Sequence, residues 1–510
     1  MGRVRSSVIN LFSAFIGQFI GILISFISRR IFIDYLSQEY LGLSGLFTNL
    51  LTMFSLVELG VGSAMTYSLY KPLAEKNENK IKSLMDLYKK AYRFIGITIL
   101  LIGLIFLPFY KYLINDIPNI KYLNLIYLLF VINTAISYFY SYKRSLIITD
   151  QKRYIATIYR YGFYFLLNIS QIMVLILTKN YILFLIVQVL FTFLENIFVS
   201  IKANKMYPYL KEKNIDKLDN NEYKEIKKNV KSMMYHKVGG LVINSTDNIL
   251  ISKLIGIAYV GIYSNYYMVL NALETIINQV FFALSSSIGN LGVTSDRKKI
   301  KKVFDNVFFM NFVVMYIITI CLIILFNNFI EVWVGKDYLF DKNIVIVIII
   351  CFYLKGMRRT CLTFKDALGL FYQDRYKPIL ESIINLIVSI ILGIKYGVIG
   401  IFIGTIISTV TTSLWVEPYV LYKYCFKENL IDYFKRFIGY TILLIISYFI
   451  INFVCSYINI NLIFNFIIKG IVSTILCFII IIIVFKNTDE FRYFKNLVGK
   501  IFKKLIFIKK

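Results

Sequence analysis

Long apolar stretches joined by short polar connections run through almost the whole chain. A helix needs about 20 apolar residues to cross the roughly 30 Å hydrocarbon core of a bilayer, and fourteen stretches come close to or exceed that length. The pattern therefore predicts an all-α membrane protein of about 14 transmembrane helices, at residues 8–33, 41–67, 92–114, 122–148, 154–178, 181–203, 236–256, 259–287, 306–330, 343–366, 378–394, 397–421, 437–456 and 461–485.

Two short motifs return after about 220 residues. Tyr40–Leu43 (YLGL) returns as Tyr259–Ile262 (YVGI) at an offset of 219, and Gln151–Tyr154 (QKRY) returns as Gln373–Tyr376 (QDRY) at an offset of 222. Two echoes at nearly the same offset indicate a duplicated membrane bundle. Such bundles, with a site at the interface between the repeats, are the usual build of secondary transporters.

The duplication predicts two six-helix lobes, an N-terminal lobe at 1–205 and a C-terminal lobe at 232–425. The longest polar stretch, 206–231, is the predicted cytoplasmic linker between them. Because six is even, both lobes enter the membrane from the same side, which predicts a pseudo-two-fold axis along the membrane normal. Two extra helices at 430–485 follow the duplication, and the basic tail at 486–510 is predicted to bind anionic inner-leaflet lipid.

Composition agrees with a membrane protein, since 58% of the residues are hydrophobic and the mean hydropathy is +0.68, well above a soluble domain. The net charge of +28 does not imply a nucleic-acid partner, because the charges follow the predicted membrane path. One side of that path carries 46 Lys and Arg residues and the other carries 9. The positive-inside rule then places both termini in the cytoplasm.

Several kinds of catalytic chemistry have no motif here. The sequence lacks a G-x-x-x-x-G-K-[ST] phosphate loop, which argues against ATP hydrolysis. The one histidine, His236, has no second imidazole for a zinc site or a Ser-His-Asp triad. The six cysteines have no metal or redox spacing. The chain is therefore predicted not to be an enzyme, and neither a metal nor a cofactor is expected.

Ionisable residues inside predicted spans are the candidate site residues, because a charge in a bilayer is costly unless it faces a cavity or a partner. Arg29 and Arg30 end the first span, and an arginine fork matches phosphate oxygens. At least one is expected to face a cavity and bind an anion there, unless both reach the outer interface instead. Lys253 and Asn248 complete the substrate-binding candidates.

Three carboxylates lie deeper in the predicted spans, and they are candidates for binding a coupling ion, either a proton or sodium: Glu58, Asp247 and Glu274. The alternative is that each pairs with a buried cation or backbone donor and only fixes helix packing. Glu195 and Glu417 fall at equivalent positions, 222 residues apart, and are interpreted as a structural cap or gate.

Sequence motifs resemble those of a known family. The segment Ser28–Leu51, and the segment Ala367–Pro378 followed by Glu381, Asn385 and Lys395–Gly400, are similar to bacterial polysaccharide transporters. These are the oligosaccharide flippases of the multidrug, oligosaccharidyl-lipid and polysaccharide (MOP) exporter superfamily. Ser37 departs from the family pattern, which usually has glycine there.

The resemblance implies a flippase of the bacterial cytoplasmic membrane that moves undecaprenyl-pyrophosphate-linked oligosaccharide from the inner to the outer leaflet by alternating access. Its product would serve cell-surface polysaccharide such as O-antigen or capsule, with a polysaccharide polymerase and glycosyltransferases as candidate partners. In relatives, the last two helices are thought to form a groove for the lipid tail. Lys469 and Arg160 are the candidates for a lipid phosphate beside such a groove.

Three alternatives remain open at the level of sequence. A peptidoglycan-precursor flippase of the same superfamily is not separated by these motifs. A multidrug or cation antiporter predicts a carboxylate-rich cavity and usually twelve helices, so the fourteen predicted spans and the Arg29–Arg30 pair argue against it. A membrane polysaccharide polymerase or ligase needs a large outer loop, whereas the longest predicted outer connection, 330–343, is short.

Overall fold

The computed structural model describes residues 3–58, 60–212, 215–216, 218–370, 372–458, 461–496 and 499, with side chains described except at 3–15, 221, 225, 229, 231–244 and 286. The predicted lipid-binding residues at 500–510 and the side chain of His236 therefore lie outside the described residues.

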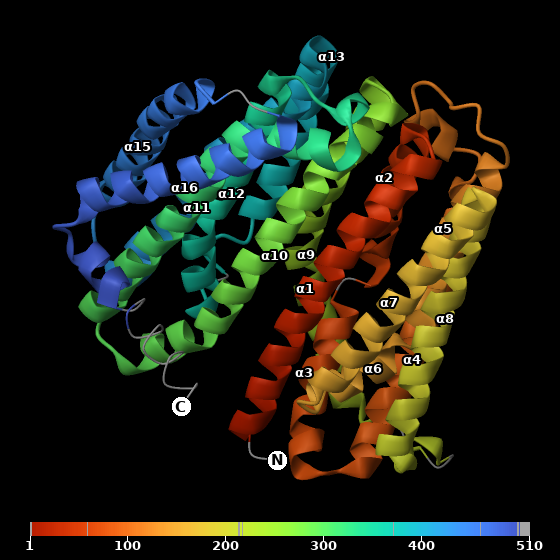
Figure 1. Ribbon diagram of the computed structural model, residues 1–510. Coiled ribbons are helices and arrows are strands. Elements are labelled where there is room, and N and C mark those ends of the chain that lie inside the picture. The colour runs from red at the N-terminus through yellow and green to blue at the C-terminus, as the bar shows by residue number, and fades with distance from the viewer. Residues whose placement is uncertain are drawn as a thin grey trace, which may run out of the picture. The chain divides into compact units, whose positions relative to one another are not determined.

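Every regular element in these described ranges is a helix, which confirms the predicted all-α class (Figure 1). The helices are α1 (Arg3–Tyr35), α2 (Gln38–Phe54), η1 (Ser55–Glu58), α3 (Val61–Glu75), α4 (Glu78–Phe106), η2 (Tyr110–Leu113), α5 (Leu123–Phe139), α6 (Ser141–Thr149), α7 (Arg153–Thr178), α8 (Tyr181–Met206), η3 (Pro208–Lys211), α9 (Asn220–Leu254), α10 (Ile257–Thr294), α11 (Arg297–Val334), η4 (Lys336–Tyr338), α12 (Lys342–Ala367), α13 (Lys377–Thr411), α14 (Ser413–Val420), η5 (Leu421–Phe426), α15 (Ile431–Ser456) and α16 (Leu462–Phe485).

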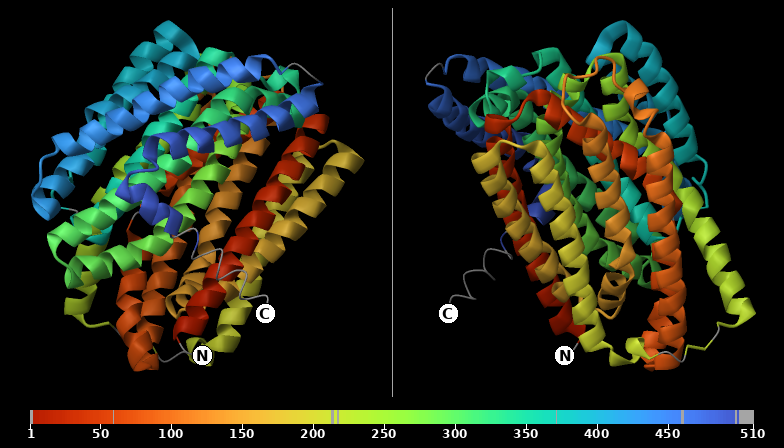
Figure 2. Two further views of the ribbon diagram at one scale, coloured as in Figure 1. Left: turned by 60° about the vertical axis from the view of Figure 1, so that its left-hand side comes forward. Right: turned by 90° about the vertical axis from the view of Figure 1, so that its right-hand side faces the viewer.

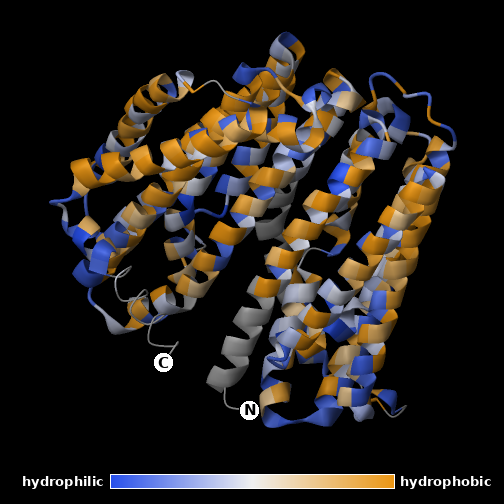
Figure 3. Ribbon diagram, in the orientation of Figure 1, coloured by the Kyte–Doolittle hydropathy of each residue, from blue (hydrophilic) through white to orange (hydrophobic). Residues whose placement is uncertain are grey.

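Nine helices in the described part of the chain are long and apolar enough to cross a membrane, or ten if the bent pair α5 and α6 is one span. The chain is thus a multi-pass membrane protein. Each of the fourteen predicted segments overlaps a helix or a broken pair of helices, and the exact number of spans stays a prediction. Figure 3 shows the apolar residues that run along α15 and α16.

Breaks within the predicted spans have local causes. The span at 41–67 is interrupted by the 3₁₀ turn η1 and by Gly60. The backbone of Gly60 has a left-handed conformation with a φ of 85°, which glycine adopts without a steric penalty. α5 and α6 meet at an angle of 44°. α13 consists of two helical segments that meet at a break at Gly397 (φ 63°), so the predicted spans at 378–394 and 397–421 fall on either side of this break.

The chain divides into two compact units, 1–264 and 265–510. In the first, α1 packs on α7, α4 packs on α5, and α8 contacts both α5 and α7, as the views in Figures 1 and 2 agree. α9 also belongs to this unit, where it packs on α2 and α3. The boundary falls inside α10, and the predicted linker at 206–231 includes the start of α9. The lobe boundaries predicted from the duplication therefore remain a prediction.

The second unit is built around α11, which packs on α12, α15 and α16. Phe304, Phe308 and Phe312 recur every four residues, so they lie on one face of this helix. All three are buried. Phe312 stacks on Tyr440 of α15 with ring centroids 4.0 Å apart, and Phe308 lies 5.1 Å from Tyr433. Aromatic packing therefore fixes α15 against α11.

The two copies of the repeated Tyr-x-Gly motif contact each other inside the first unit. A Cβ atom on Gly42 of α2 would overlap the carbonyl oxygen of Ile257. A Cβ atom on Gly261 of α10 would overlap the carbonyl oxygen of Gln38. Glycine at both positions lets the two helix backbones approach this closely, as small residues commonly do in membrane helix pairs.

Candidate functional site

The two arginines of α1 have different environments. Arg29 is half-buried, and its Nη1 donates a hydrogen bond to Ser264 Oγ of α10 at 2.8 Å. Arg30 is exposed and forms an ion pair with Asp34 one turn later at 3.2 Å. Arg29 is thus directed at a second helix of its unit, whereas Arg30 is paired on the exposed face of α1. Arg29 is therefore the better candidate for binding an anion, because its side chain is half-buried and its orientation is fixed by Ser264.

Lys253 and Asn248 lie on α9. Lys253 is exposed and forms no ion pair with a described residue. Asn248 is 9% exposed, and its side-chain nitrogen lies 3.4 Å from the place where a Cβ atom would stand on Gly45 of α2. Its Oδ1 is buried and has no hydrogen-bond partner among the described residues. A buried amide oxygen without a hydrogen bond is unusual and costly. Packing against α2 alone does not explain why an asparagine, rather than an apolar residue, stands at position 248.

Glu58 ends the 3₁₀ turn that breaks the second predicted span, and it accepts a hydrogen bond from Tyr92 of α4. The distance from Tyr92 Oη to Glu58 Oε1 is 2.9 Å. Tyr88 lies one turn earlier on α4, and its hydroxyl contacts Tyr92 Oη at 3.5 Å and the carbonyl oxygen of Gly62 at 3.4 Å. This group combines one carboxylate, two hydroxyls and a helix break. Interrupted membrane helices of this kind are where ion sites are built in secondary transporters.

The other two carboxylate candidates differ from Glu58. Asp247 is half-buried on α9 in the first unit. Glu274 of α10, in the second unit, accepts a hydrogen bond from Lys355 of α12 at 2.9 Å. Lys355 is about half exposed, whereas the Glu274 side chain is 25% exposed. Glu274 therefore has a cation partner, as the alternative hypothesis of structural pairing expects.

The two lipid-groove candidates fall in different units. Lys469 is half-buried on α16, next to Gly470, which approaches Leu325 of α11. It forms no ion pair with a described residue. Arg160 is exposed on α7 in the first unit. Each remains a candidate on its own helix.

The densest buried ion network in the described part of the chain joins α12, α13 and α14 in the second unit. Arg358 lies 2.8 Å from one oxygen of Glu417 and 3.1 Å from Glu381. Lys377 donates to the same Glu417 oxygen at 2.5 Å, and Ser413 donates to Glu381 at 2.5 Å. Glu417 is fully buried. Removing one member of such a network leaves an uncompensated buried charge.

The first unit repeats part of this arrangement. Arg144 of α6 donates to Glu195 of α8 at 2.5 Å, and Glu195 stands 222 residues before Glu417. Both glutamates therefore accept from an arginine on a neighbouring helix of their own bundle. This pairing fits the interpretation of Glu195 and Glu417 as structural caps. The arginines themselves are not at equivalent sequence positions.

Sequence reasoning missed several of these residues. Tyr88, Tyr92, Lys377 and Arg358 are not among the candidates predicted from the sequence. The spacing of Tyr88 and Tyr92 places both on one face of a helix, which is a usable signal. No sequence signal says that this face meets Glu58. No group of three or more His, Cys, Asp or Glu side chains within the described ranges is placed to hold a metal.

Comparisons with known proteins identify the fold of the chain. No protein-family model matches the sequence, and no curated protein matches it. Among solved structures, the lipid II flippase MurJ in an inward closed conformation is 16% identical with a TM-score of 0.68, over 92% of this chain and 98% of that one. An inward-facing multidrug resistance MATE family transporter of the MOP superfamily is 13% identical with a TM-score of 0.63, over 78% and 94%. The MATE transporter VcmN of Vibrio cholerae is 14% identical with a TM-score of 0.57, over 83% and 99%.

These likenesses show that the chain has the fold of MOP superfamily transporters and of the lipid II flippase. The resemblance found in the sequence motifs predicted this fold. Because fold alone does not define function, the cargo and the site residues have to be argued from the chain itself.

Proposed function

We propose that the chain is a flippase of the MOP superfamily that moves an undecaprenyl-pyrophosphate-linked oligosaccharide from the inner to the outer leaflet by alternating access. It acts in the bacterial cytoplasmic membrane with both termini in the cytoplasm, and its product feeds cell-surface polysaccharide synthesis. The polymerase and the glycosyltransferases of that synthesis are its proposed partners. The function is transport, without catalysis.

The observation that carries this proposal is the share of the chain that each similar structure covers. The Vibrio cholerae MATE transporter is matched over 99% of its length yet covers only 83% of this chain. The lipid II flippase covers 92%. Part of the chain therefore has no counterpart in that transporter, and we infer that this part includes α15 and α16, which follow the predicted duplication. A lipid-linked cargo supplies a reason for extra membrane helices, because its tail has to stay in the bilayer during transport.

The candidate cargo site supports an anionic headgroup. Arg29 is held by Ser264 at 2.8 Å in a half-buried position, and guanidinium groups bind pyrophosphate oxygens through paired hydrogen bonds. Lys253 supplies a second cation in the same unit, and Asn248 supplies a buried amide. This set of donors favours an anion over the cationic drugs that an antiporter exports.

Transport of a charged lipid needs an energy source, and Glu58 is the proposed coupling carboxylate. It sits at a helix break, where it accepts a hydrogen bond from the neutral hydroxyl of Tyr92 and forms no ion pair with a described residue. A carboxylate without a cation partner can exchange its proton or a sodium ion as the transporter changes state. Glu274 is paired with Lys355 and is the weaker candidate.

A flippase for a peptidoglycan precursor is the second candidate function, favoured by the likeness to the lipid II flippase. The test is a comparison of cargoes in proteoliposomes that contain the purified chain. Labelled undecaprenyl-pyrophosphate oligosaccharide, labelled lipid II and a cationic drug are supplied separately. Preferred movement of the oligosaccharide supports the proposal, preferred movement of lipid II replaces it with the second candidate, and drug export alone contradicts both.

A further inference from the structure

The polar stretch that connects α8 to α9 lies against the first unit. The sequence pattern predicts a linker at 206–231, whereas the structure places η3 and the first turns of α9 within this range. Figure 2 shows that α8 ends and α9 begins at the same end of the unit. The described residues of 207–230 are named the strap here, and all of them belong to the first unit.

Two polar contacts join the first half of the strap to the start of α4. The Nζ atom of Lys82 lies 2.7 Å from a carboxylate oxygen of Glu212. The hydroxyl of Ser83 donates a hydrogen bond to the carbonyl oxygen of Asp216 at 2.7 Å. The side chain of Lys82 is only 9% exposed, and removing the partner of a buried charge is strongly destabilising. Glu212 of the strap therefore supplies a charge that the start of α4 requires.

The first turns of α9 hold the second half of the strap on the same unit. Glu222 forms an ion pair with Lys80 of α4. One turn later, Ile226 is buried in an apolar cluster that also contains side chains from α3, α4, α6 and α8. Four more strap residues are partly buried against this cluster: Tyr209, Leu210, Leu218 and Val230. The strap is therefore held by apolar burial as well as by charge.

The start of the strap is fixed to a third helix. Tyr207 is 5% exposed and belongs to the same apolar cluster. Its hydroxyl donates a hydrogen bond at 2.7 Å to the carboxylate of Asp150, which directly follows α6. The strap is thus attached at its start, in its middle and at its end, and a flexible tether would have no such series of contacts.

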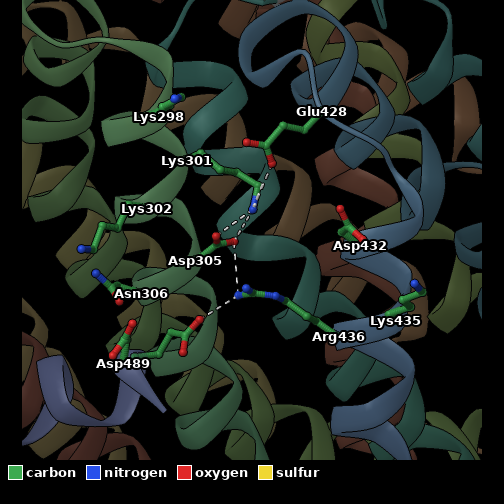
Figure 4. A pocket seen from close by; sticks show the side chains of 11 residues that line it. Lys298, Lys301, Lys302, Asp305, Asn306, Glu428, Asp432, Lys435, Arg436 and Asp489 are labelled. Carbon is green, nitrogen blue, oxygen red and sulfur yellow. Dashed lines mark hydrogen bonds and ion pairs between the residues drawn. The ribbon is translucent and has the colours of Figure 1, made fainter.

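The second unit contains a comparable junction around a polar cavity of about 500 Å³ (Figure 4). Five lysine and arginine side chains and five carboxylates line this cavity, so its charge selects neither an anion nor a cation. Asp305 of α11 pairs with Lys301 and with Arg436 of α15. Arg436 pairs in turn with Glu490, in the segment after α16. Ion pairs therefore attach a polar segment to neighbouring helices in each of the two units.

We propose that the strap is a fixed part of the first unit and moves with it when the protein changes conformation. The ion pairs of Lys82 with Glu212 and of Lys80 with Glu222 hold it in place, and Ile226 anchors it in the apolar cluster. The connection between the two sequence repeats then has no slack along the strap. Any movement of one repeat against the other has to occur beyond the strap. This inference depends on no particular cargo or coupling ion.

The test is amide hydrogen exchange of peptides from the strap, measured by mass spectrometry on the full chain in proteoliposomes, with and without a proton or sodium gradient. Glu212→Lys replaces the attraction to Lys82 by repulsion. Lys82→Glu combined with Glu212→Lys restores an attractive pair. Asp216→Lys is the matched control, because it makes the same charge change at an exposed position whose side chain forms no ion pair with a described residue. Thermal unfolding checks that each variant is folded.

The intact chain is expected to exchange slowly along the strap, both with and without the gradient, because the segment is docked. Glu212→Lys is expected to exchange at least about tenfold faster, the loss typical of a hydrogen bond to a charged group. The double variant and Asp216→Lys are expected to stay near the intact chain.

Four results overturn the proposal. Fast exchange in the intact chain would show a free tether, and faster exchange under the gradient would show that the strap detaches when the protein changes conformation. Unchanged exchange in Glu212→Lys, or an equal increase in Asp216→Lys, would show that the pair with Lys82 does not hold the strap. Fast exchange that persists in the double variant would show that Glu212 acts through another residue.

Discussion

Gly42 and Gly261 occupy the same position in the two copies of the repeated motif, and each packs on the carbonyl oxygen of the residue four places before the other. Gly42 faces the carbonyl of Ile257, and Gly261 faces the carbonyl of Gln38. The contact is therefore self-complementary, as expected where two repeats meet at a pseudo-two-fold axis. The duplication seen in the sequence is thus also a contact in space.

Gly42→Ala is expected to lower the thermal stability of the purified protein. The added methyl group meets a backbone carbonyl, which cannot move aside like a flexible side chain, so the cost is that of overpacking, about 1–3 kcal/mol. Gly261→Ala is expected to have a similar effect. Unfolding in detergent, followed by tryptophan fluorescence or by the loss of monodisperse protein, measures the shift.

Gly162→Ala on α7 is the matched control for this substitution. A Cβ atom there meets nothing within 4 Å, and alanine is the better helix former by about 1 kcal/mol. Its stability is expected to stay level or rise. A loss of stability equal to that of Gly42→Ala would show that the close approach of the two repeats has no special role.

Substitutions of Arg29 and Arg30 are expected to affect the transport rate to different extents. Arg29→Ala removes a half-buried donor that is held by Ser264, so transport is expected to fall at least about tenfold, the loss typical of a hydrogen bond to a charged group. Arg30→Ala removes an exposed ion pair with Asp34, which contributes little. Initial rates of flipping at matched protein content measure both. A larger loss in Arg30→Ala would place the anion site on the other face of α1.

Glu417→Gln is expected to destabilise the protein strongly. Arg358 and Lys377 then lose the buried charge that compensates them, and breaking a buried pair costs about 3–5 kcal/mol. Glu195→Gln is the comparison, because Glu195 and its partner Arg144 are more exposed and the cost should be smaller. Thermal unfolding of both variants shows which substitution lowers the stability more. Equal shifts would contradict the argument from burial.

Glu58→Gln is expected to keep the fold and to remove the dependence of transport on an ion gradient. The amide oxygen can still accept from Tyr92, whereas the charge is lost. Tyr92→Phe is the control, since it removes the hydroxyl donor and leaves the carboxylate in place. Transport is measured with and without a proton or sodium gradient. Full gradient dependence in Glu58→Gln would assign the coupling to another residue.

The fold followed from the sequence because long apolar segments and the positive-inside rule constrain membrane helices strongly. Each predicted segment overlaps a helix or a broken pair of helices, and the boundary predicted between 394 and 397 coincides with the kink at Gly397. The extent of the helices was harder to predict. α9 runs from Asn220, since its polar first turns continue the helix beyond the apolar stretch.

The candidate site followed only in part. Ionisable residues inside apolar segments stand out in a sequence, and so Arg29 and Glu58 could be named as candidates. Their partners could not be found in this way, because Ser264 is 235 residues from Arg29 and nothing in its own segment marks it. The network around Glu417 was missed for the same reason. Lys377 begins α13 and Arg358 lies in the last third of α12, and lysine and arginine are ordinary near the ends of membrane helices.

The most direct test of the central claim is the flipping of a labelled undecaprenyl-pyrophosphate oligosaccharide by the intact chain in proteoliposomes. Label that reaches the far leaflet is followed with a reagent that cannot cross the membrane, and empty liposomes and the Arg29→Ala variant are measured beside it. The account predicts rapid flipping by the intact chain and near-background flipping by folded Arg29→Ala. Flipping at the rate of empty liposomes, with transport of a cationic drug instead, would contradict it.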